Sequence, residues 1–490
     1  MRPTRTAWIL VLAAAGGCGG DDAHPGDAGS DYAETAGDAG PDAADDGAPT
    51  EDDADGGPEA DGGELPRLSS VSQFGITWTF SAPMPVGRFA NGDYYIVGPA
   101  TVAAIDPAPG GGRNGSVVNL PAENDRTGFD DRTEAGRYDA SLRADPPFEL
   151  VPGDSLVSTI SVDTLPYRGA VDYEILRPEE ETTSPVRTAA VLTCVAERQP
   201  HDAFRPAYID DADLVFRAGD LRRELLGRCP PPPSTPALAT WERVFERPWI
   251  DNLFFGFDAP TDNMADYGRE VARAVSIASL LLMVDFPAAE KETLLVRFVQ
   301  YGIDLWGIVR AGHPGWPAHG GHGSGRKWPI LFAGLLLGDA GMQALATDHP
   351  ATRFGEDMQT MHGTGWTGAT ALYAGHMGPD GESVNPGWGP YEHLHPRDWL
   401  DPIGESYRRC CTSLSWVGEA LAARMLGAEA LWAHDAFFDY VDRWMSEDDT
   451  EHVQVILDST GRDYRASWAR QRQCWDDFVE ELWTAHRTGL

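Results

Sequence analysis

The sequence predicts a mixed α+β protein with two folded parts. Residues 66–235 contain short runs rich in Val, Thr, Ile and Tyr that Gly, Pro and Asp separate, which is typical of strands joined by turns. In residues 236–490 apolar side chains recur at three- and four-residue spacing, which indicates amphipathic helices. A chain of 490 residues also exceeds the usual size of one core. We therefore expect an N-terminal antiparallel β-sandwich-like domain at 66–235 and an α/α-helical, incomplete toroid domain at 236–490.

The first residues have the composition of a secretory signal. Arg2 and Arg5 give it a positive start, and 7–15 is an apolar run too short to span a bilayer. The small residues before Cys18 resemble the cleavage site of bacterial lipoproteins, whose cysteine becomes lipidated. We therefore expect a lipoprotein signal peptide at 1–17 and a lipid anchor at Cys18, and an ordinary secretory signal is the alternative. The glycine after Cys18 favours the bacterial outer membrane or cell surface over the inner membrane.

An acidic segment of low complexity follows the signal. Between residues 19 and 64 the chain has sixteen Asp or Glu and no Lys or Arg, with almost no large apolar side chain. Such a segment cannot bury enough surface to fold, so we expect a disordered acidic tether at 18–65. The formal net charge of the whole chain is −38. The negative electrostatic field of such a chain repels the phosphate backbone of nucleic acids, so we expect no nucleic-acid partner.

Five runs in the first folded part are predicted to be strands. They span 75–80, 93–98, 101–106, 155–162 and 187–195. In the first run Ile76, Trp78 and Phe80 alternate with Thr, so we expect their side chains to share one buried face.

Six segments of the second part have helical spacing. They span 267–286, 288–309, 328–337, 405–426, 428–445 and 466–483. Successive amphipathic helices without strands between them predict helical hairpins packed side by side.

Two long stretches interrupt these helices, at 311–327 and at about 362–404. Both lack helical periodicity and are rich in Gly, His, Trp and Tyr. A glycine-rich loop with many ionisable groups costs ordering entropy and buries little apolar surface, so it is more often a site than scaffold. Because the loops of helical hairpins gather at the rims of the array, we expect these two loops to meet.

The residue types in the two loops fit β-elimination on an acidic, uronate-containing polysaccharide. That reaction needs a group that neutralises the carboxylate, a base that removes the C5 proton, and an acid that protonates the leaving oxygen. The candidates, in that order, are Arg326, Lys327 and Asn385; His319 and His322; and Tyr391 and Tyr407. Candidates for binding the sugar rings are Trp316, Trp366, Trp388 and His393.

A strand-rich domain joined to helices with His-, Tyr-, Arg- and Asn-rich loops resembles the polysaccharide lyases of (α/α)-toroid type, the alginate lyase and heparinase-like group. The resemblance covers roughly 240–490 and rests on architecture and residue types. It implies lytic cleavage of an acidic polysaccharide by a surface-anchored protein. In the heparinase-like enzymes the β-domain follows the toroid, whereas here it comes first.

Three other interpretations compete with elimination. Glycoside hydrolysis would use two carboxylates, for which Glu382, Asp398, Asp401 and Glu405 are available. A metal site would use His313, His319 and His322, with His393 and His395 as a second pair. The spacing of these histidines matches no zinc motif, so we expect no cofactor. A glycan-binding or structural surface lipoprotein would need no catalytic group at all.

Five cysteines follow Cys18. An exported protein allows disulfides, and Cys194 with Cys229 would form one bridge within the first folded part. Cys474 would bridge to Cys410 or Cys411. The odd number leaves at least one thiol unbridged.

Overall fold

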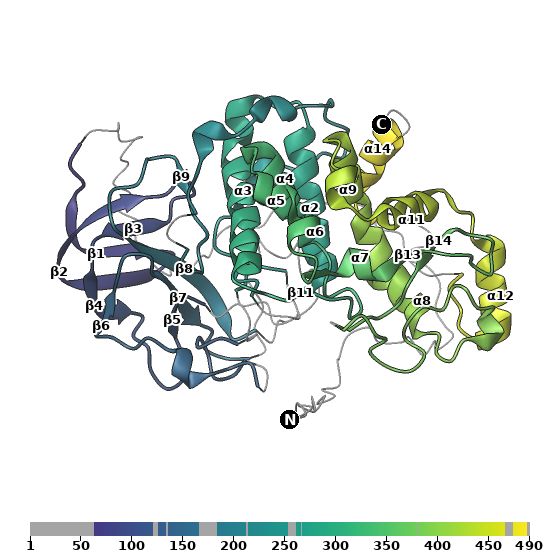
Figure 1. Cartoon of the computed structure of the whole chain (residues 1–490), viewed down its shortest axis with the longest axis horizontal. Helices are drawn as coiled ribbons and strands as arrows, with labels where there is room; N and C mark the ends of the chain where they lie inside the picture. Colours follow the sequence, from purple (N-terminus) through teal and green to yellow (C-terminus); the bar gives the residue numbers. More distant parts are fainter. Residues whose placement is uncertain are drawn as a thin grey trace, which may run out of the picture. The chain divides into compact units, whose positions relative to one another are not determined.

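The computed structural model describes residues 63–120, 126–133, 136–165, 184–211, 214–252, 261–265, 267–378, 380–465 and 474–487. The predicted signal peptide at 1–17, Cys18 and nearly all of the tether at 18–65 lie outside these residues. Within them, strands come first and helices follow, which confirms a mixed α+β protein (Figure 1). The boundary that we predicted at residue 235 lies inside one compact unit, which spans 57–490.

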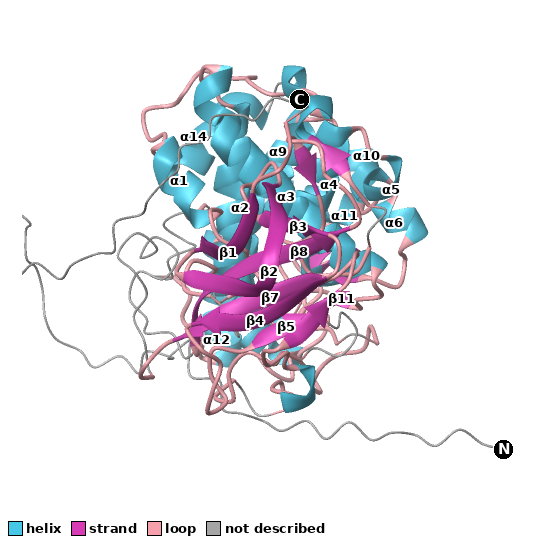
Figure 2. Ribbon diagram, turned by 90° about the vertical axis from the view of Figure 1, so that its left-hand side faces the viewer, coloured by secondary structure: helices cyan, strands magenta, loops and turns pink. Residues whose placement is uncertain are grey.

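Eight strands form one curled sheet in the order β5-β7-β8-β3-β2-β4-β6, with β1 paired to β2 (Figure 2). They are β1 Arg67–Gln73, β2 Ile76–Arg88, β3 Tyr94–Val97, β4 Ala100–Asp106, β5 Ser116–Val118, β6 Phe148–Leu150, β7 Ser155–Ser161 and β8 Val186–Val195. All five predicted strands are confirmed. The pairing is antiparallel except between β3 and β8, which run parallel. A sandwich is not confirmed, because the other described sheets have two strands each.

The alternation in β2 fixes which face of the sheet is buried. Ile76, Trp78 and Phe80 are all buried, as predicted, and the residues between them are partly exposed. Burying an apolar side chain of this size contributes roughly 2 kcal/mol. The Trp78 indole also donates a hydrogen bond to the Ser158 hydroxyl on β7 at 2.9 Å, so its polar atom is satisfied inside the core.

The second part is mainly helical. Its helices are α1 Leu238–Val244, α2 Gly268–Met283, α3 Ala288–Arg310, α4 Lys327–Leu337, α5 Ala340–Gln343, α6 Leu345–Asp348, α7 Gly355–Gln359, α8 Ile403–Tyr407, α9 Ser413–Met425, α10 Glu429–Trp432, α11 Asp435–Ser446, α12 Thr450–Thr460 and α14 Asp477–His486. Helices α2, α3, α4 and α9 lie side by side and share the largest core (Figure 1). A closed or incomplete toroid is not confirmed by this arrangement.

The predicted helices differ from the observed ones in several ways. The segment 428–445 is divided into α10 and α11, and residues 466–473 of the predicted helix 466–483 lie outside the described residues. The segment 405–426 is not continuous, because a π-helical turn, Arg408–Thr412, separates α8 from α9. Short strands also occur where we expected none: β11 Gly315–Trp316 pairs with β12 Arg353–Phe354, and β13 Thr360–His362 pairs with β14 Ala371–Tyr373. These strands are two or three residues long, too short to produce an alternating pattern that the sequence could reveal.

The sheet and helix α3 share buried contacts. The Ala207 backbone N–H donates to the Asp304 carboxylate at 2.9 Å, and the Tyr208 hydroxyl donates to the Trp249 carbonyl at 2.9 Å. Ile308 of α3 belongs to the same buried cluster as Val157 of β7. The sheet part is therefore packed against α3.

The predicted cysteine pairings are wrong. Cys194 and Cys229 are separate buried thiols, since one lies in β8 inside the sheet and the other lies beside the end of α2. Cys474 is also a buried thiol. The disulfide instead joins the neighbours Cys410 and Cys411 within the π-helical turn.

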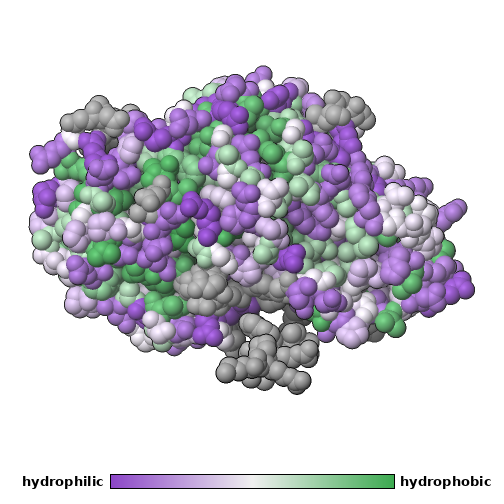
Figure 3. All heavy atoms as spheres, viewed as in Figure 1, coloured by the Kyte–Doolittle hydropathy of each residue, from purple (hydrophilic) through white to green (hydrophobic). Residues whose placement is uncertain are grey.

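On the face shown in Figure 3, hydrophilic residues cover most of the surface, with smaller hydrophobic areas among them. In the described part of the chain we find no helix with the length and apolar character that a membrane span requires.

Candidate functional site

The loops 311–327 and 362–404 meet, as we predicted. The Met377 backbone N–H donates to the Ala318 carbonyl at 2.8 Å. Beside this contact, the Gln359 amide at the end of α7 donates to the Gly320 carbonyl at 2.6 Å and to the Tyr373 hydroxyl at 3.0 Å. The backbones of the two loops are thus tied together directly and through a buried glutamine.

Rings from both loops and from two helices gather at this junction. We call this group the ring cluster; it consists of Tyr267, His319, His322, His376, Trp388 and Tyr407. Ring centroids of His319 and His322 are 5.8 Å apart, and His376 lies 5.8 Å from His319. Tyr407 packs edge-on against His376 at 4.4 Å, and Tyr267 packs in the same way against His322. Apart from His376, the members are partly exposed, while Nδ1 of both His319 and His322 is buried.

Trp388 forms one side of the ring cluster. Its ring stacks with His319 at 6.4 Å between centroids and with only 19° between the planes, and it lies 5.1 Å from His376. The indole N–H donates to the Asp401 carboxylate at 3.0 Å, which fixes the ring orientation. Leu400, next to Asp401, is 83 % exposed and adds an apolar surface nearby.

Two glycines let the first loop approach the ring cluster closely. Gly320 has φ of +62°, and a Cβ on it would lie 2.8 Å from the Tyr407 ring. A Cβ on Gly321 would lie 2.1 Å from the carbonyl oxygen of Cys411. The Gly321 backbone N–H also donates to the Tyr267 hydroxyl at 2.8 Å. Glycine is therefore sterically required at these two positions, because the loop contacts the start of α2 and the turn that contains the disulfide.

The histidines of the ring cluster are neutral at neutral pH. Burial lowers the pKa of His319 and lowers that of His376 to about 3. For His322 burial is again the main cause, and the neighbouring His319, Arg326 and His376 lower its pKa further. Each imidazole is therefore in the form that can accept a proton, and its lowered pKa also makes it a weaker base than a free histidine.

Arg326 does not fit the role that we predicted for it. Its side chain is fully buried and forms an ion pair with Asp251, with Nε 2.7 Å from Oδ2. Nη2 donates to the same carboxylate at 3.2 Å, and Nη1 donates to the carbonyls of His322 and Ser324 at 2.8 and 2.7 Å. Arg326 therefore holds the loop from inside, and no substrate carboxylate can contact it in this conformation.

Lys327 and Tyr391 are also engaged inside the protein. Lys327 is buried, pairs with Asp357 and donates to the Trp432 carbonyl at 2.6 Å. The Tyr391 hydroxyl donates to the buried carboxylate of Glu405 at 2.7 Å. Of the predicted catalytic residues, the structure brings together His319, His322 and Tyr407. Asn385 is partly exposed, and its carbonyl accepts the Trp388 backbone N–H at 3.0 Å.

The predicted sugar-binding residues are dispersed. Trp316 is fully buried, and its indole donates to the Asp251 carbonyl at 3.2 Å, so it cannot stack on a sugar. Trp366 is partly exposed but lies against His395 and His452. His393 is exposed. Trp388 is the member of this set that contacts the ring cluster.

Sequence reasoning did not assign roles to Tyr267 and His376, although His376 belongs to the second loop. His376 is 1 % exposed, and its Nδ1 has no hydrogen-bond partner among the described residues. No spacing connects either residue to His319 or His322, so only the folded chain reveals that they belong together.

The carboxylates proposed for hydrolysis do not form a pair. Arg408 and Arg409 surround Glu405 and lower its pKa despite its burial. Asp401 binds the Trp388 indole, and Glu382 and Asp398 are exposed. The predicted metal ligand His313 is buried and bonds to the Asn252 carbonyl at 2.9 Å, and burial lowers its pKa to about 4. The described residues include no group of three or more His, Cys, Asp or Glu placed to hold a metal ion.

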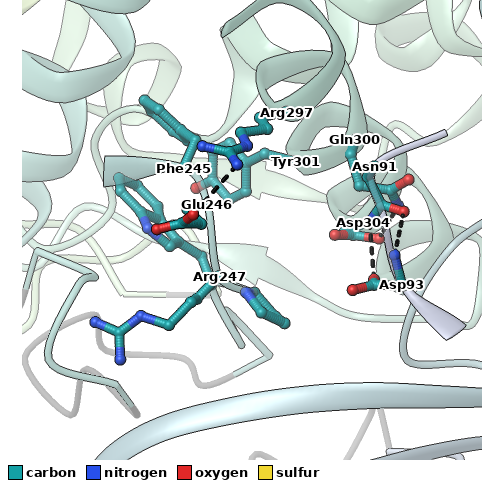
Figure 4. A pocket seen from close by; sticks show the side chains of 11 residues that line it. Asn91, Asp93, Phe245, Glu246, Arg247, Arg297, Gln300, Tyr301 and Asp304 are labelled. Atoms are coloured by element: carbon teal, nitrogen blue, oxygen red, sulfur yellow. Dashed lines mark hydrogen bonds and ion pairs between the residues drawn. The ribbon is translucent and has the colours of Figure 1, made fainter. Parts of the chain in front are cut away.

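A small pocket lies elsewhere, where the sheet meets α3 (Figure 4). Asn91 and Asp93 face Gln300 and Asp304, and Phe245 and Arg297 lie on the other side. The Asp93 carboxylate accepts hydrogen bonds from Asn91 and Gln73, and burial raises its pKa to about 6. These polar groups bond mainly to one another, so we place the functional site at the ring cluster.

The fold and the site thus define a mixed α+β protein in which loops between helices bring histidines, tyrosines and a tryptophan together. Comparisons with protein-family models, with curated proteins and with solved structures found no match to this chain.

Proposed function

We propose that this protein is a surface-anchored carbohydrate-active enzyme that cleaves an acidic, uronate-containing polysaccharide by β-elimination at the ring cluster. The observation that carries the proposal is the meeting of partly exposed, neutral histidines with a partly exposed tyrosine and a tryptophan. The helical half would accordingly be an incomplete α/α toroid, the sheet a sandwich-like domain, and Cys18 the lipid anchor at the outer membrane or cell surface.

In this proposal His319 is the base. It is partly exposed, its pKa is lowered by burial, and its ring is parallel to the indole of Trp388. A sugar ring resting on Trp388 would present its edge to the neighbouring imidazole. Removal of the C5 proton by a neutral imidazole leaves a carbanion that the uronate carboxylate delocalises.

Tyr407 is the acid, and Asn385 binds the uronate carboxylate. Tyr407 and Trp388 both pack on His376, so a substrate on the indole would have the base and the acid within one group of rings. Asn385 precedes Trp388 by three residues and is partly exposed. An amide N–H that strengthens its hydrogen bond as charge develops stabilises the transition state. Arg326, Lys327 and Tyr391 have no part in this chemistry, because each is buried in an internal contact.

The geometry gives less support to hydrolysis. An inverting or retaining glycosidase needs two carboxyl groups across the bond. Of the four carboxylates that we considered, Asp401 bonds to a ring of the cluster and Glu405 is held by two arginines.

The experiment is absorbance in the ultraviolet when the purified protein meets alginate, glucuronan or a glycosaminoglycan. Elimination leaves an unsaturated uronate that absorbs, whereas hydrolysis gives reducing ends without this absorbance. The variants His319→Ala and Tyr407→Phe should each lower the rate by about 100-fold or more. Matched controls are His201→Ala and Tyr94→Phe, which change residues of the sheet part.

Two outcomes would replace the proposal. Reducing ends without absorbance would establish a hydrolase. Retention on a glycan column without any product would establish a binding protein, and the ring cluster would then be its binding surface.

A further inference from the structure

The disulfide between Cys410 and Cys411 lies directly beneath the ring cluster. The carbonyl of Cys411 is in contact with Gly321, between His319 and His322. Tyr407 lies on the other side of the π-helical turn and packs on His376. Arg269, near the start of α2, donates to the Cys410 carbonyl at 3.0 Å. Three parts of the candidate site thus depend on the conformation of this one turn.

Neighbouring cysteines cannot be bridged in a regular α-helix. Successive side chains point about 100° apart around the helix, so residues i and i+1 do not face each other. The chain departs from α-helical geometry where the bridge occurs: Arg408–Thr412 is a π-helical turn. Thr412 has φ of −132° and ψ of −74°, outside the helical region. Regular α-helices precede and follow it, which places the irregularity at the disulfide.

The two cysteine residues differ in exposure. Cys410 is partly exposed, whereas Cys411 is fully buried. We therefore expect attack at Cys410, and the thiol released on opening would be the buried one. The three other described cysteines, Cys194, Cys229 and Cys474, are buried.

From these contacts we infer that Cys410–Cys411 is a redox-active site, opened by a dithiol reductant, whose state sets the position of Tyr407 and of the His319–His322 loop. A thiolate of the dithiol attacks Sγ of Cys410, and the S–S bond breaks. Cys411 leaves as a thiolate and takes up a proton. The second thiol of the reductant then attacks the mixed disulfide and releases Cys410 as a thiol. Two electrons and two protons pass to the protein, and the reductant becomes a disulfide.

The contacts around the turn decide where the released segment can move. Before it, the carboxylate of Glu405 accepts a hydrogen bond from Tyr391 and pairs with Arg408 and Arg409 of the turn itself, so the anchored point is Glu405, and Tyr407 lies between it and the turn. After it, α9 packs along α2, where the Ser276 hydroxyl donates to the Ser415 carbonyl at 3.2 Å. Without the bridge, the turn between these two anchored points is less constrained, and its backbone opens more often. This opening moves Tyr407 and removes the surface on which Gly321 rests.

The test uses the full chain, folded without reductant. When the denatured protein is alkylated without reductant, the peptide that contains Cys410 and Cys411 should carry no alkyl group and should be two hydrogen masses lighter than its reduced form. After treatment with dithiothreitol, both residues should be alkylated. In the native protein, dithiothreitol should speed amide exchange at 408–412 roughly tenfold, and reoxidation should restore protection. Alkylation of both Cys410 and Cys411 in the air-folded protein, or equal exchange before and after reduction, would overturn the inference.

A variant separates this site from the other thiols. Cys410→Ser/Cys411→Ser should show the fast exchange without reductant and no response to it, whereas Cys474→Ser should respond like the wild type. If the double variant does not fold, reduction of the native wild type still decides. The effect on turnover rests on the proposed function: reduction should lower the elimination rate severalfold. If no substrate is cleaved but the exchange responds, the redox site stands and the proposed function fails.

Discussion

The rings of His376 and Tyr407 meet edge-on, with 4.4 Å between their centroids, although one lies in a loop and the other ends helix α8. Through this contact the second loop and the helical segment position each other. Burial of His376 among rings lowers its pKa to about 3, so its imidazole is neutral and contributes an uncharged surface to the site. The predictions below change one support of the ring cluster at a time.

Gly321→Ala should displace the first loop. The added Cβ would lie 2.1 Å from the Cys411 carbonyl oxygen and 3.0 Å from the Tyr267 ring, and the backbone carbonyl leaves little room for adjustment. We expect at least about a tenfold loss of turnover or glycan binding, since a 1 Å displacement of reacting groups is costly. Gly110→Ala is the control, because a Cβ there meets nothing within 4 Å. Equal activity of the two variants would contradict the close packing described here.

The activity should have an acid limb below the ordinary histidine range. Burial lowers the pKa of His319, so the base is already neutral at about pH 6.5, where a free histidine is half protonated. We expect turnover to stay constant from neutral pH down to about pH 6.5 and to fall below it as His319 takes up a proton. A pH–rate profile measures this directly. A rate that already falls between pH 8 and 7 would exclude His319 as the base.

Asp251→Asn should destabilise the protein by about 3 kcal/mol or more, because it leaves the buried charge of Arg326 unpaired. Denaturant unfolding of the variant and the wild type gives this difference. Asp398→Asn, which changes an exposed carboxylate, should lie within about 0.5 kcal/mol of the wild type. A small effect at Asp251 would mean that solvent reaches the pair.

Glu419→Gln should stabilise the protein more at pH 8 than at pH 5. Glu419 is fully buried, and burial together with the nearby Glu356 raises its pKa well above the ordinary value. Burial raises the pKa of Glu356 to about 7. The folded protein therefore keeps protons that the unfolded chain releases above about pH 4.5, so wild-type stability falls as the pH rises from there. Each pH unit costs up to about 1.4 kcal/mol per group.

Unfolding curves of the wild type and Glu419→Gln at pH 5 and pH 8 test this sign. The variant should lose less stability between the two values than the wild type does. Glu382→Gln, at an exposed carboxylate, is the control and should follow the wild type. If the free energy of unfolding of the wild type changes between pH 5 and pH 8 by the same amount as that of the variant, the raised pKa of Glu419 is contradicted.

Trp388→Ala should weaken glycan binding by about tenfold or more, because the indole is the aromatic face of the ring cluster and a stacked ring contributes about 1–3 kcal/mol. Affinity electrophoresis in gels that contain the polysaccharide measures the effect. Trp366→Ala removes an equally large ring that lies against His395 and His452 instead. If both variants bind alike, the ring cluster is not the binding surface.

Periodicity predicted the secondary structure well, and chemistry predicted the site only in part. The alternation of Ile76, Trp78 and Phe80 gave the buried face of β2, because a strand buried on one side leaves that local signal. The glycines and rings of the two loops indicated where the site would form. What periodicity cannot give is a contact between distant residues, such as His376 with Tyr407.

The incorrect roles that we predicted for Arg326 and Lys327 have one cause. Arg326 and Lys327 look like substrate-binding cations in a loop, yet both begin a buried helix and satisfy Asp251 and Asp357. Their partners lie far away in the chain, so no local pattern reveals the pairing. The disulfide was missed for a different reason: helical periodicity over 405–426 predicted a continuous helix, in which Cys410 and Cys411 could not be bridged.

The parallel pairing of β3 with β8 has a consequence for how the chain folds during its synthesis. The register joins Tyr94 to Leu192, and β8 lies in the middle of the sheet between β3 and β7. The strands from β1 to β7 therefore emerge from the ribosome before their central neighbour exists, and β3 exposes an unpaired edge until residue 195 has followed. Such edges recruit other chains, and pairing over so long a separation is slow. A nascent chain that stalls before β8 needs a chaperone at that edge, and one that passes it can close the sheet by itself.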